Sequence, residues 1–418
     1  MEQKQIPDRA IFADLQVHSR YARATSKNLS IDNLEKYGKI KGLNLIGTGD
    51  FQHPLHRKEI DEKLIENDNG ILRTKSGSGV AFLWQTEISL MFSQGGKGRA
   101  VHLLVFAPNK KIADKITNYL ISKGRIDYDG RPIFGIPCEQ FVKDLKEIED
   151  KIEIIPAHCM TPYFGIFGSK SGFDSLRECF GEQTEKIHAV ESGMSADPSM
   201  LWRFEEIATG EINIVSFSDA HSFWPWRIGR EATVFDVPEL SYNNIIKAIR
   251  TGEGLNSTIE TPPAYGRYHF DGHRNCGFSS SPEKTAELKG ICPICKKQLI
   301  IGVENRVEQL AYNPLGFKPK NAKPFYKILP LHELIAAAVG SGLESRKTWE
   351  IYNSLINNFG NEFNVLFYVT KEKMLEKKFD NNLVEIIIKN REEKIKIKPG
   401  YDGVYGEIIT EEEQKKLF

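Results

Sequence analysis

Short apolar runs alternate with amphipathic stretches through residues 10–250 of this 418-residue chain. Strand–helix alternation of this kind indicates parallel βαβ units, and about seven such units would close into a barrel. Ser30 is placed to cap a helix that runs to Lys41, and helical patterns also cover Cys138–Ile148 and Met200–Thr209. The runs that we expect to be strands are Ala10–Val17, Leu43–Gly47, Val80–Ile88, Ala100–Ala107, Ile152–Ala157, Lys186–Glu191 and Ile212–Phe217.

Histidines and carboxylates stand in or directly after most of these runs, where the carboxyl ends of barrel strands would gather them. Imidazole and carboxylate ligands suit Zn, Mn or Fe, and two or three such ions can drive a displacement at phosphorus. Any one of these residues could equally be a polar strand cap. The whole set favours one shared multi-metal hydrolytic site. Its members are His18, Asp50, Glu87, His102, His158, Asp219 and His221.

Composition excludes some classes of function. The 56 basic and 56 acidic residues give a formal net charge of zero, so any nucleic-acid binding must come from local patches. The first nine residues are polar, and no run approaches the roughly 20 apolar residues of a membrane-spanning helix. We therefore expect a cytoplasmic protein with no membrane partner.

Three of the six cysteines lie between residues 276 and 295. His273, Cys276, Cys292 and Cys295 have the H-x2-C…C-x2-C spacing of a structural zinc site, with His269 as an alternative fourth ligand. A redox role for Cys292 and Cys295 is the other interpretation. We expect one structural Zn that stabilises a module too small to bury much core by itself.

A change in composition over residues 252–266, where Thr-Pro-Pro and several glycines gather, predicts a linker. The predicted domains are a catalytic barrel (1–255), a zinc-binding module (256–310) and a helical, DNA-contacting C-terminal domain (311–418). Lys318, Lys320 and Lys323 lie among aromatic residues in a stretch without acidic side chains, which suits phosphate contact and base stacking. A proline-broken, solvated linker is the alternative.

The order of the motifs resembles the PHP (polymerase and histidinol phosphatase) superfamily, and longer strings resemble its endonuclease Q family. These strings are Ser19–Ser26, Gly47–Phe51, Thr161–Phe164, Gly168–Phe173, Trp226–Glu231 and Pro399–Gly406, together with the cysteine module. The resemblance implies an α/β fold with a distorted (β/α)7 barrel and a trinuclear site. It also implies a DNA-repair endonuclease that uses metal-activated hydroxide to cut 5′ to deaminated bases (uracil, hypoxanthine, xanthine) or abasic sites. The divalent ions would be Zn, Mn or Mg.

The same seven residues occupy the positions of the family's metal ligands. Gln16 is a departure, because the family pattern has the first histidine of a His-x-His pair there. A neutral amide oxygen is a weaker ligand than imidazole for a transition metal, so Gln16 would weaken one metal position or disable the site. His53 and Glu191 lie near the site in motif order, either as weak ligands or as residues that orient a ligand.

An enzyme that acts on a damaged base must expose it, usually by extrusion into a pocket. The loops after two ligand-bearing strands, 163–173 and 223–230, are best placed to form that pocket. Their candidate DNA or base contacts are Tyr163, Phe164, Lys170, Trp224, Trp226, Arg227 and Arg230. The alternative is that the aromatic residues only cover the barrel.

The last five residues, Gln414–Phe418, resemble a truncated sliding-clamp-binding peptide, but a plain terminal helix is the simpler interpretation. Two other functions stay open from the sequence. One is a small-molecule phosphoesterase of the PHP superfamily, and the other is a non-catalytic DNA-damage binder in which Gln16 disables the metal site.

Overall fold

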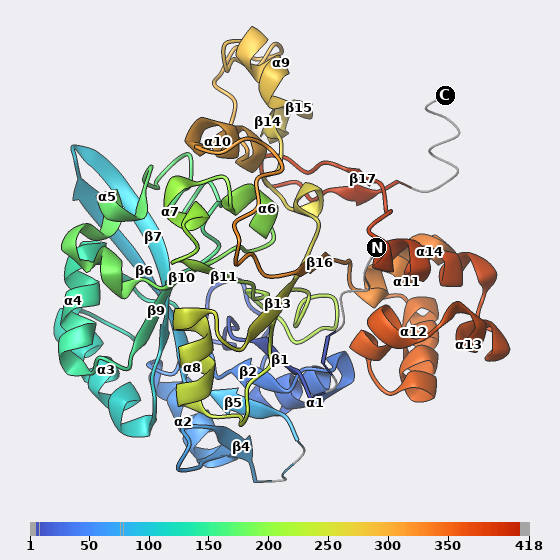
Figure 1. Ribbon diagram of the computed structural model, residues 1–418, viewed down its shortest axis with the longest axis horizontal. Coiled ribbons are helices and arrows are strands. Elements are labelled where there is room, and N and C mark those ends of the chain that lie inside the picture. The colour runs from blue at the N-terminus through green and yellow to red at the C-terminus, as the bar shows by residue number, and fades with distance from the viewer. Residues whose placement is uncertain (1–5, 8, 76, 78, 410–418) are drawn as a thin grey trace.

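The computed structural model describes residues 6–7, 9–75, 77 and 79–409 of a mixed α/β protein (Figure 1). Its largest sheet has eight strands in the order β16-β13-β12-β1-β2-β5-β4-β3. In chain order these strands are β1 (Ile11–Asp14), β2 (Leu45–Gly47), β3 (Leu64–Glu66), β4 (Leu72–Thr74), β5 (Ala81–Leu83), β12 (Ala232–Phe235), β13 (Leu255–Glu260) and β16 (Phe325–Lys327).

A second sheet has four strands in the order β8-β6-β7-β9, and three further sheets have two strands each. The four strands are β6 (Gln85–Gln94), β7 (Lys97–Phe106), β8 (Ile133–Phe134) and β9 (Glu153–Pro156). The two-stranded sheets pair β10 (Ala189–Glu191) with β11 (Asn213–Val215), β14 (Asp271–His273) with β15 (Phe278–Ser280), and β17 (Ile397–Lys398) with β18 (Glu407–Ile408).

Helices cover these sheets and form a lobe at one side, where α11–α14 lie together in Figure 1. Ser30 caps α1 by accepting the Asn33 N–H at 3.2 Å, as predicted, and α4 has the predicted bounds. The α-helices are α1 (Ile31–Lys41), α2 (Pro54–Lys63), α3 (Lys110–Lys123), α4 (Cys138–Ile148), α5 (Leu176–Phe180), α6 (Pro198–Leu201), α7 (Glu205–Ala208), α8 (Tyr242–Thr251), α9 (Pro282–Glu287), α10 (Val303–Leu310), α11 (Leu331–Val339), α12 (Arg346–Phe359), α13 (Lys371–Glu376) and α14 (Asn381–Arg391). Short 3-10 or π-helical turns complete the set: η1 (Gly181–Lys186), η2 (Pro263–Tyr265), η3 (Arg274–Cys276) and η4 (Asn364–Tyr368).

The expectation of parallel units throughout was wrong for several parts of the chain, and β4 pairs antiparallel with both β3 and β5. β6 and β7 form an antiparallel hairpin of ten residues a strand, and β12 pairs antiparallel with both β1 and β13. Gly95 and Gly96, with φ of 60° and 72°, supply the left-handed backbone that a two-residue hairpin turn requires. Among the described residues, the hydrogen-bonded ladders do not close into a single barrel.

Two local predictions also need correction. The stretch Met200–Thr209 is not one helix, because the Arg203 carbonyl accepts the Tyr312 and Asn313 N–H groups, both at 2.9 Å, and the chain turns between α6 and α7. The expected linker at 252–266 contains β13, whose parallel partner β16 comes from the segment after the cysteine module. The eight-stranded sheet therefore includes a strand from the C-terminal segment.

The helical lobe is joined to the main sheet through a continuous hydrophobic core and one buried ion pair. The ring centroids of Phe12 on β1 and Phe363 lie 4.9 Å apart. The Lys41 ammonium donates to the Glu362 carboxylate at 2.7 Å and to the Pro225 carbonyl at 2.8 Å. Because both charges are buried, separation of the lobe from the sheet would leave each charge without its partner.

The same interface holds a buried neutral histidine. The His332 ring lies 4.7 Å from Trp226, 4.4 Å from Trp349 and 4.4 Å from Tyr352, between ring centroids. Neither of its ring nitrogens has a hydrogen-bond partner. Burial, and then the nearby Lys41 cation, lower the pKa of His332 to about 3.

We expect His332 to make the protein less stable in mild acid. The unfolded chain, with a histidine pKa of about 6.5, binds the proton more readily than the folded protein, so stability is lost as the pH falls from about 6.5 toward 3. Between pH 7.5 and pH 5 this side chain should cost about 2 kcal/mol of unfolding free energy. Urea unfolding at both pH values should show that His332→Leu loses this part of the pH dependence. An equal pH dependence in both proteins would contradict the assignment.

Within the part of the chain that the structure describes, no helix combines the length and the apolar character needed to cross a membrane.

Candidate metal centre

All seven predicted metal ligands lie in one contiguous cluster. His18 and Asp50 follow β1 and β2, His158 follows β9, and Asp219 and His221 follow β11. Glu87 and His102 differ from the prediction, because they lie within the hairpin strands β6 and β7 and not after a strand end. Because β7 runs antiparallel to β6 and β9, His102 lies beside the candidate ligands that follow the parallel strands.

Glu87 is the centre of one half of the cluster and is fully buried. Its Oε1 lies 2.7 Å from His102 Nδ1 and 3.5 Å from His158 Nε2. The same oxygen accepts from the Arg131 guanidinium at 3.1 Å. Glu87, His102 and His158 each present one donor atom, and these atoms lie within 4.8 Å of one another, close enough to share an ion.

His18 is the centre of the other half. Its Nδ1 lies 3.1 Å from Asp50 Oδ1, and its Nε2 lies 3.1 Å from Asp219 Oδ1 and 3.3 Å from Glu87 Oε2. His18, Asp219 and His221 also present donor atoms within 4.8 Å of one another. Glu87 therefore faces both halves, as a carboxylate that bridges two ions must.

Three members of the cluster adopt a left-handed backbone that residues with a side chain rarely take. Asp50 and His158 have φ of 33°, and Asp219 has φ of 49°. Each follows a strand and turns its side chain back into the cluster. Backbone strain of this kind is maintained where it positions functional groups.

The charge balance of the cluster suits cations. Burial alone would raise the pKa of Glu87, but Arg131 and His102 hold it well below its usual value. Burial, and then Arg131, lower the pKa of His102 to about 3, so this imidazole is neutral, while the neighbouring carboxylates raise the pKa of His18 and of His158. Anionic carboxylates beside a neutral imidazole form a donor set that fits divalent metal ions.

Gln16 lies inside this donor set. Its Nε2 donates to Glu87 Oε2 at 2.8 Å, while its Oε1 is buried and has no hydrogen-bond partner among the described residues. An unpaired buried amide oxygen costs free energy, which coordination to a cation would recover. The geometry is consistent with a weak ligand position, which stays a prediction.

We expect Gln16→His to bind catalytic metal at least about tenfold more tightly than the natural chain, because imidazole is the stronger ligand. Competition against a coloured chelator measures this affinity. Gln16→Ala is the matched control, since it also loses the hydrogen bond to Glu87 but adds no donor. Equal affinities for the histidine and alanine variants would show that position 16 does not face a metal.

Glu191 and His53 have different surroundings. The Glu191 carboxylate accepts three backbone N–H groups, from His158, from Gly193 at 2.7 Å and from Phe217 at 3.2 Å. It thus holds the backbone of a ligand. His53 stacks on Tyr21 at 4.6 Å between ring centroids, and its Nδ1 has no partner. Glu191 therefore fits an orienting role better than direct ligation, and the contacts of the His53 ring support neither role.

A cavity of about 580 Å³ opens beside the cluster, with His102, His158, Asp219 and His221 in its wall. Four of the predicted DNA contacts line it: Tyr163, Phe164, Arg227 and Arg230. The Phe164 ring stacks on His102 at 4.3 Å, and the Phe164 carbonyl accepts the His102 N–H at 2.9 Å. The loop 163–173 is therefore part of the site.

The other predicted DNA contacts lie elsewhere. Trp224 and Trp226 stack on each other at 5.5 Å and pack against Trp349 of the helical lobe, outside the cavity wall. Lys170 is exposed on the same loop as Tyr163.

The lysines of the segment after α10 lie on another side of the molecule. Lys318 and Lys320 are exposed, and Lys323 lies next to Gly252 and Asn213, at the amino end of β11. Asp219 follows the carboxyl end of that strand. The basic–aromatic segment is thus placed away from the metal ligands.

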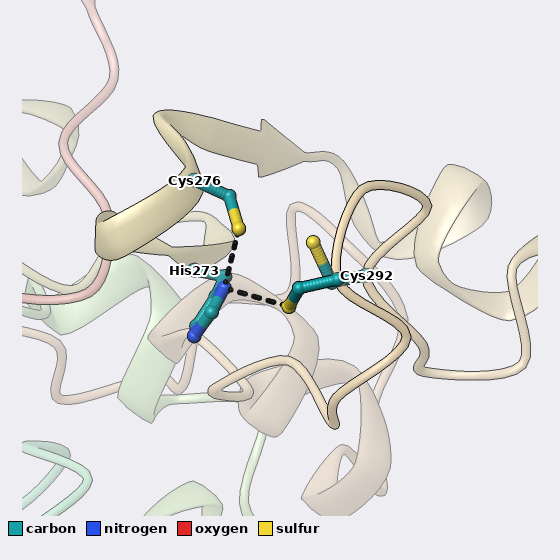
Figure 2. Close-up of side chains that lie close together, drawn as sticks. His273, Cys276 and Cys292 are labelled. Carbon is teal, nitrogen blue, oxygen red and sulfur yellow. Dashed lines mark hydrogen bonds between the residues drawn. The ribbon is translucent and has the colours of Figure 1, made fainter.

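The four predicted zinc ligands converge in the module formed by β14, η3 and β15. His273 Nδ1 lies 3.1 Å from Cys276 Sγ and 3.3 Å from Cys295 Sγ (Figure 2). With Cys292, the four donor atoms lie within 4.8 Å of one another, as a closed tetrahedral site requires. The alternative ligand His269 lies outside this group, 3.8 Å from Glu304.

This module is hydrogen-bonded to the loop 163–173, which lines the cavity. Arg306 on α10 donates from Nε to the Phe167 carbonyl at 2.9 Å and from Nη2 to the Phe173 carbonyl at 3.1 Å. Ser169 donates to the Ile301 carbonyl at 2.9 Å. Because this loop carries Phe164, the module supports a residue that contacts the metal ligand His102.

Sequence reasoning missed several side chains of the site. Arg131 comes from a loop without a motif, and Arg267, Tyr268 and Tyr405 line the cavity from segments far along the chain. The string Pro399–Gly406 was a signal for Tyr405, but nothing in the spacing indicated that it reaches the barrel.

Two crystal structures resemble this chain along nearly its whole length. One is the lesion-specific endonuclease PfuEndoQ from Pyrococcus furiosus, 30% identical, with a TM-score of 0.84 and 97% of each chain covered. The other is endonuclease Q in complex with a 27-mer duplex that has an abasic lesion at the active site. It is also 30% identical, with a TM-score of 0.85, and the match covers 97% of this chain and 98% of that one.

The sequence relatives also match this chain over most of its length. The uncharacterized protein YqxK of Bacillus subtilis is 26% identical over 95% of this chain and 99% of its own length. The uncharacterized protein MJ0043 of Methanocaldococcus jannaschii is 30% identical over 305 residues, which are 70% of this chain but only 36% of the longer archaeal protein. The family described as MJ0043 C-terminal domain matches residues 330–394. The similarity thus includes the helical lobe as well as the metal ligands.

Proposed function

This chain belongs to the endonuclease Q family of DNA-repair endonucleases, and we propose that it hydrolyses the phosphodiester 5′ to deaminated bases (uracil, hypoxanthine, xanthine) or abasic sites. The observation that carries the proposal is the single cluster of seven metal-type ligands beside a cavity of about 580 Å³, with four of the seven in its wall. A cavity of this size admits an extruded nucleotide. The products would be a 3′-hydroxyl and a 5′-phosphate.

The finer architecture belongs to the same proposal. The motif order and the parallel pairs β1–β2, β2–β5 and β10–β11 favour a distorted (β/α)7 barrel of the PHP type over residues 1–255. We assign 256–310 to a zinc-binding module and 311–418 to a helical domain. A cytoplasmic location stays a prediction. The proposed clamp peptide, Gln414–Phe418, lies outside the described residues.

We propose that the seven ligands hold Zn, Mn or Mg ions, with Gln16 as a weak additional donor. When bound, such ions activate water and stabilise charge on a phosphate undergoing displacement. The chain orients the ligands. Thr161 Oγ1 lies 3.0 Å from His158 Nδ1 and so turns Nε2 toward Glu87, while Arg131 fixes Glu87 Oε1. Phe164 covers one face of His102 and excludes water from it.

For DNA, we propose that Tyr163 and Phe164 contact the extruded nucleotide and that Arg227 and Arg230 contact its phosphates. Lys170 would meet the backbone at the outer edge of the loop. Trp224 and Trp226 act by packing the loop 223–230 against the helical lobe. From their position, Lys318, Lys320 and Lys323 would reach only DNA that continues around the molecule.

One assay tests the function. A duplex with a single uracil, hypoxanthine or abasic site, labelled at its 5′ end, is incubated with the protein and Mg, Mn or Zn. We expect one nick on the 5′ side of the lesion and none in the undamaged duplex. Binding without cleavage would instead identify a damage binder. Turnover of a simple phosphate ester, with the duplex intact, would identify a small-molecule phosphoesterase.

A further inference from the structure

Three arginine side chains meet in the cavity beside the metal ligands without a carboxylate partner. Arg227, Arg230 and Arg267 all line it. Within the described residues, none of the three forms an ion pair with an aspartate or glutamate. This contrasts with Arg131 in the same cavity, which is paired with Glu87.

The three guanidiniums are held by neutral groups. Arg230 donates from Nε and Nη2 to the Ser218 carbonyl at 3.1 and 2.9 Å, while its Nη1 is buried without a partner. Arg267 donates from Nε to the Gly403 carbonyl at 3.0 Å. The guanidinium carbons of Arg227 and Arg267 lie 5.5 and 5.3 Å from the centre of the Tyr405 ring, within cation–π distance.

The surroundings of these cations differ, because burial lowers the pKa of Arg230 but Tyr405, Glu231 and Asp219 raise it above its usual value. Burial, and then Arg230, lower the pKa of Arg227. Burial alone would raise the pKa of the Tyr405 phenol, yet Arg230, Arg227 and Arg267 lower it below its usual value. Arg227 and Arg230 are partly buried and have no ion-pair partner within the described residues, so an anionic ligand in the cavity would be stabilised by both, and the exposed Arg267 lines the same cavity.

We propose that Arg227, Arg230 and Arg267, with Tyr405 positioning two of them, bind one non-scissile phosphodiester of the lesion strand. Guanidinium groups match the oxygens of a phosphodiester in paired hydrogen bonds. Arg230 is anchored at Ser218, which precedes the metal ligand Asp219, so the bound phosphate is a close neighbour of the scissile one. The inference rests on the proposed function, because it assumes that DNA enters this cavity.

The subsite explains why two segments outside the barrel reach the catalytic cavity. Tyr405 lies between β17 and β18, and Arg267 precedes β14. The hairpin is fastened to residues 264–270, because the Gly400 N–H donates to the Ala264 carbonyl at 2.9 Å and the Gly406 N–H donates to the Tyr265 carbonyl at 3.0 Å. A Cβ at either glycine would lie 2.2 or 2.3 Å from a backbone oxygen, so only glycine permits this approach.

The test neutralises the phosphates of the substrate one at a time. Duplexes with one abasic site carry a single methylphosphonate at successive positions on either side of the lesion. Binding is measured by fluorescence anisotropy and nicking in single turnover, for the natural protein, Arg267→Gln, Tyr405→Phe and Tyr405→Ala. Lys247→Gln is the control, since it removes one exposed charge from α8, where Lys247 pairs with Glu253.

We expect one non-scissile position at which the methylphosphonate weakens binding by the natural protein about tenfold. Arg267→Gln should bind the unmodified duplex correspondingly more weakly and lose sensitivity at that position alone. Lys247→Gln should keep the sensitivity of the natural protein. Tyr405→Ala should resemble Arg267→Gln, and Tyr405→Phe, which keeps the ring against both arginines, should recover part of the lost sensitivity.

Equal penalties in the natural protein and Arg267→Gln at every position would overturn the subsite, even if nicking is normal. Failure of the proposed function has a different signature, namely no nick in the unmodified lesion duplex by the natural protein. In that case the position-specific binding data still decide whether the arginines hold a phosphodiester.

Discussion

Glu87→Gln is expected to reduce the rate of lesion-dependent nicking by about 10³-fold or more, because it removes the carboxylate that faces both halves of the ligand cluster. Glu87 contacts His18, His102, His158 and Arg131 through its two oxygens. A neutral amide of the same shape cannot balance two cations. Single-turnover nicking of an abasic duplex, with metal content measured on the same preparation, checks the prediction.

The duplex should still bind to Glu87→Gln within a few-fold of the natural affinity, since the cavity arginines are unchanged. Glu62→Gln, on the exposed face of α2, is the matched control and should nick normally. Natural rates with full metal content in Glu87→Gln would remove this carboxylate from the metal site. An unfolded variant would be recognised by its melting curve and replaced by Glu87→Asp.

Cys292→Ser is expected to lose one equivalent of zinc and the fold of the module around it. Structural zinc sites contribute on the order of 10 kcal/mol to the folding of small modules, far more than the limited core of this one. Zinc analysis and limited proteolysis of the whole protein measure both effects, with cleavage expected inside 266–310. Cys138→Ala is the control, because that buried thiol on α4 lies outside the cluster.

The loss should extend to nicking, because Arg306 connects α10 of the module to the loop that carries Phe164. Arg306→Ala separates the two effects, since it should keep its zinc and still nick more slowly, while Arg306→Lys should recover part of the rate. Unchanged zinc content and an unchanged protease pattern in Cys292→Ser would refute a zinc site. Normal nicking by Arg306→Ala would limit the module to stability.

The sequence predicts features that depend on interactions between residues close together in the chain. Ser30 caps α1 through a hydrogen bond to a residue three positions away, and the four zinc-type ligands lie in two short knuckles. The metal ligands were identifiable by their donor chemistry and their place beside apolar runs. Gly95 and Gly96 indicate a hairpin turn between β6 and β7. The alternation of strand and helix patterns nevertheless predicts parallel units for both strands.

Sequence position alone could not show which distant segments meet. Arg131 reaches Glu87 from a loop 44 residues away, and Tyr405 reaches the cavity from the far end of the chain. Trp224 and Trp226 look like base-stacking residues in sequence, yet they pack against Trp349 because burial of aromatic surface at the lobe interface is available to them.

The donor chemistry of this protein can be read along the chain: a set of imidazole and carboxylate donors, a separate thiolate cluster and the strings of its family. Three other features become visible only in the folded molecule, namely which arginines share a cavity without an ion-pair partner, the pairing of β13 with β16 of the C-terminal segment, and which lysines lie away from the candidate metal ligands. The reason is that donor type and helical or strand period are properties of neighbouring residues. Strand partners and the charge balance of a cavity depend instead on long-range packing, which brings together residues that the sequence separates.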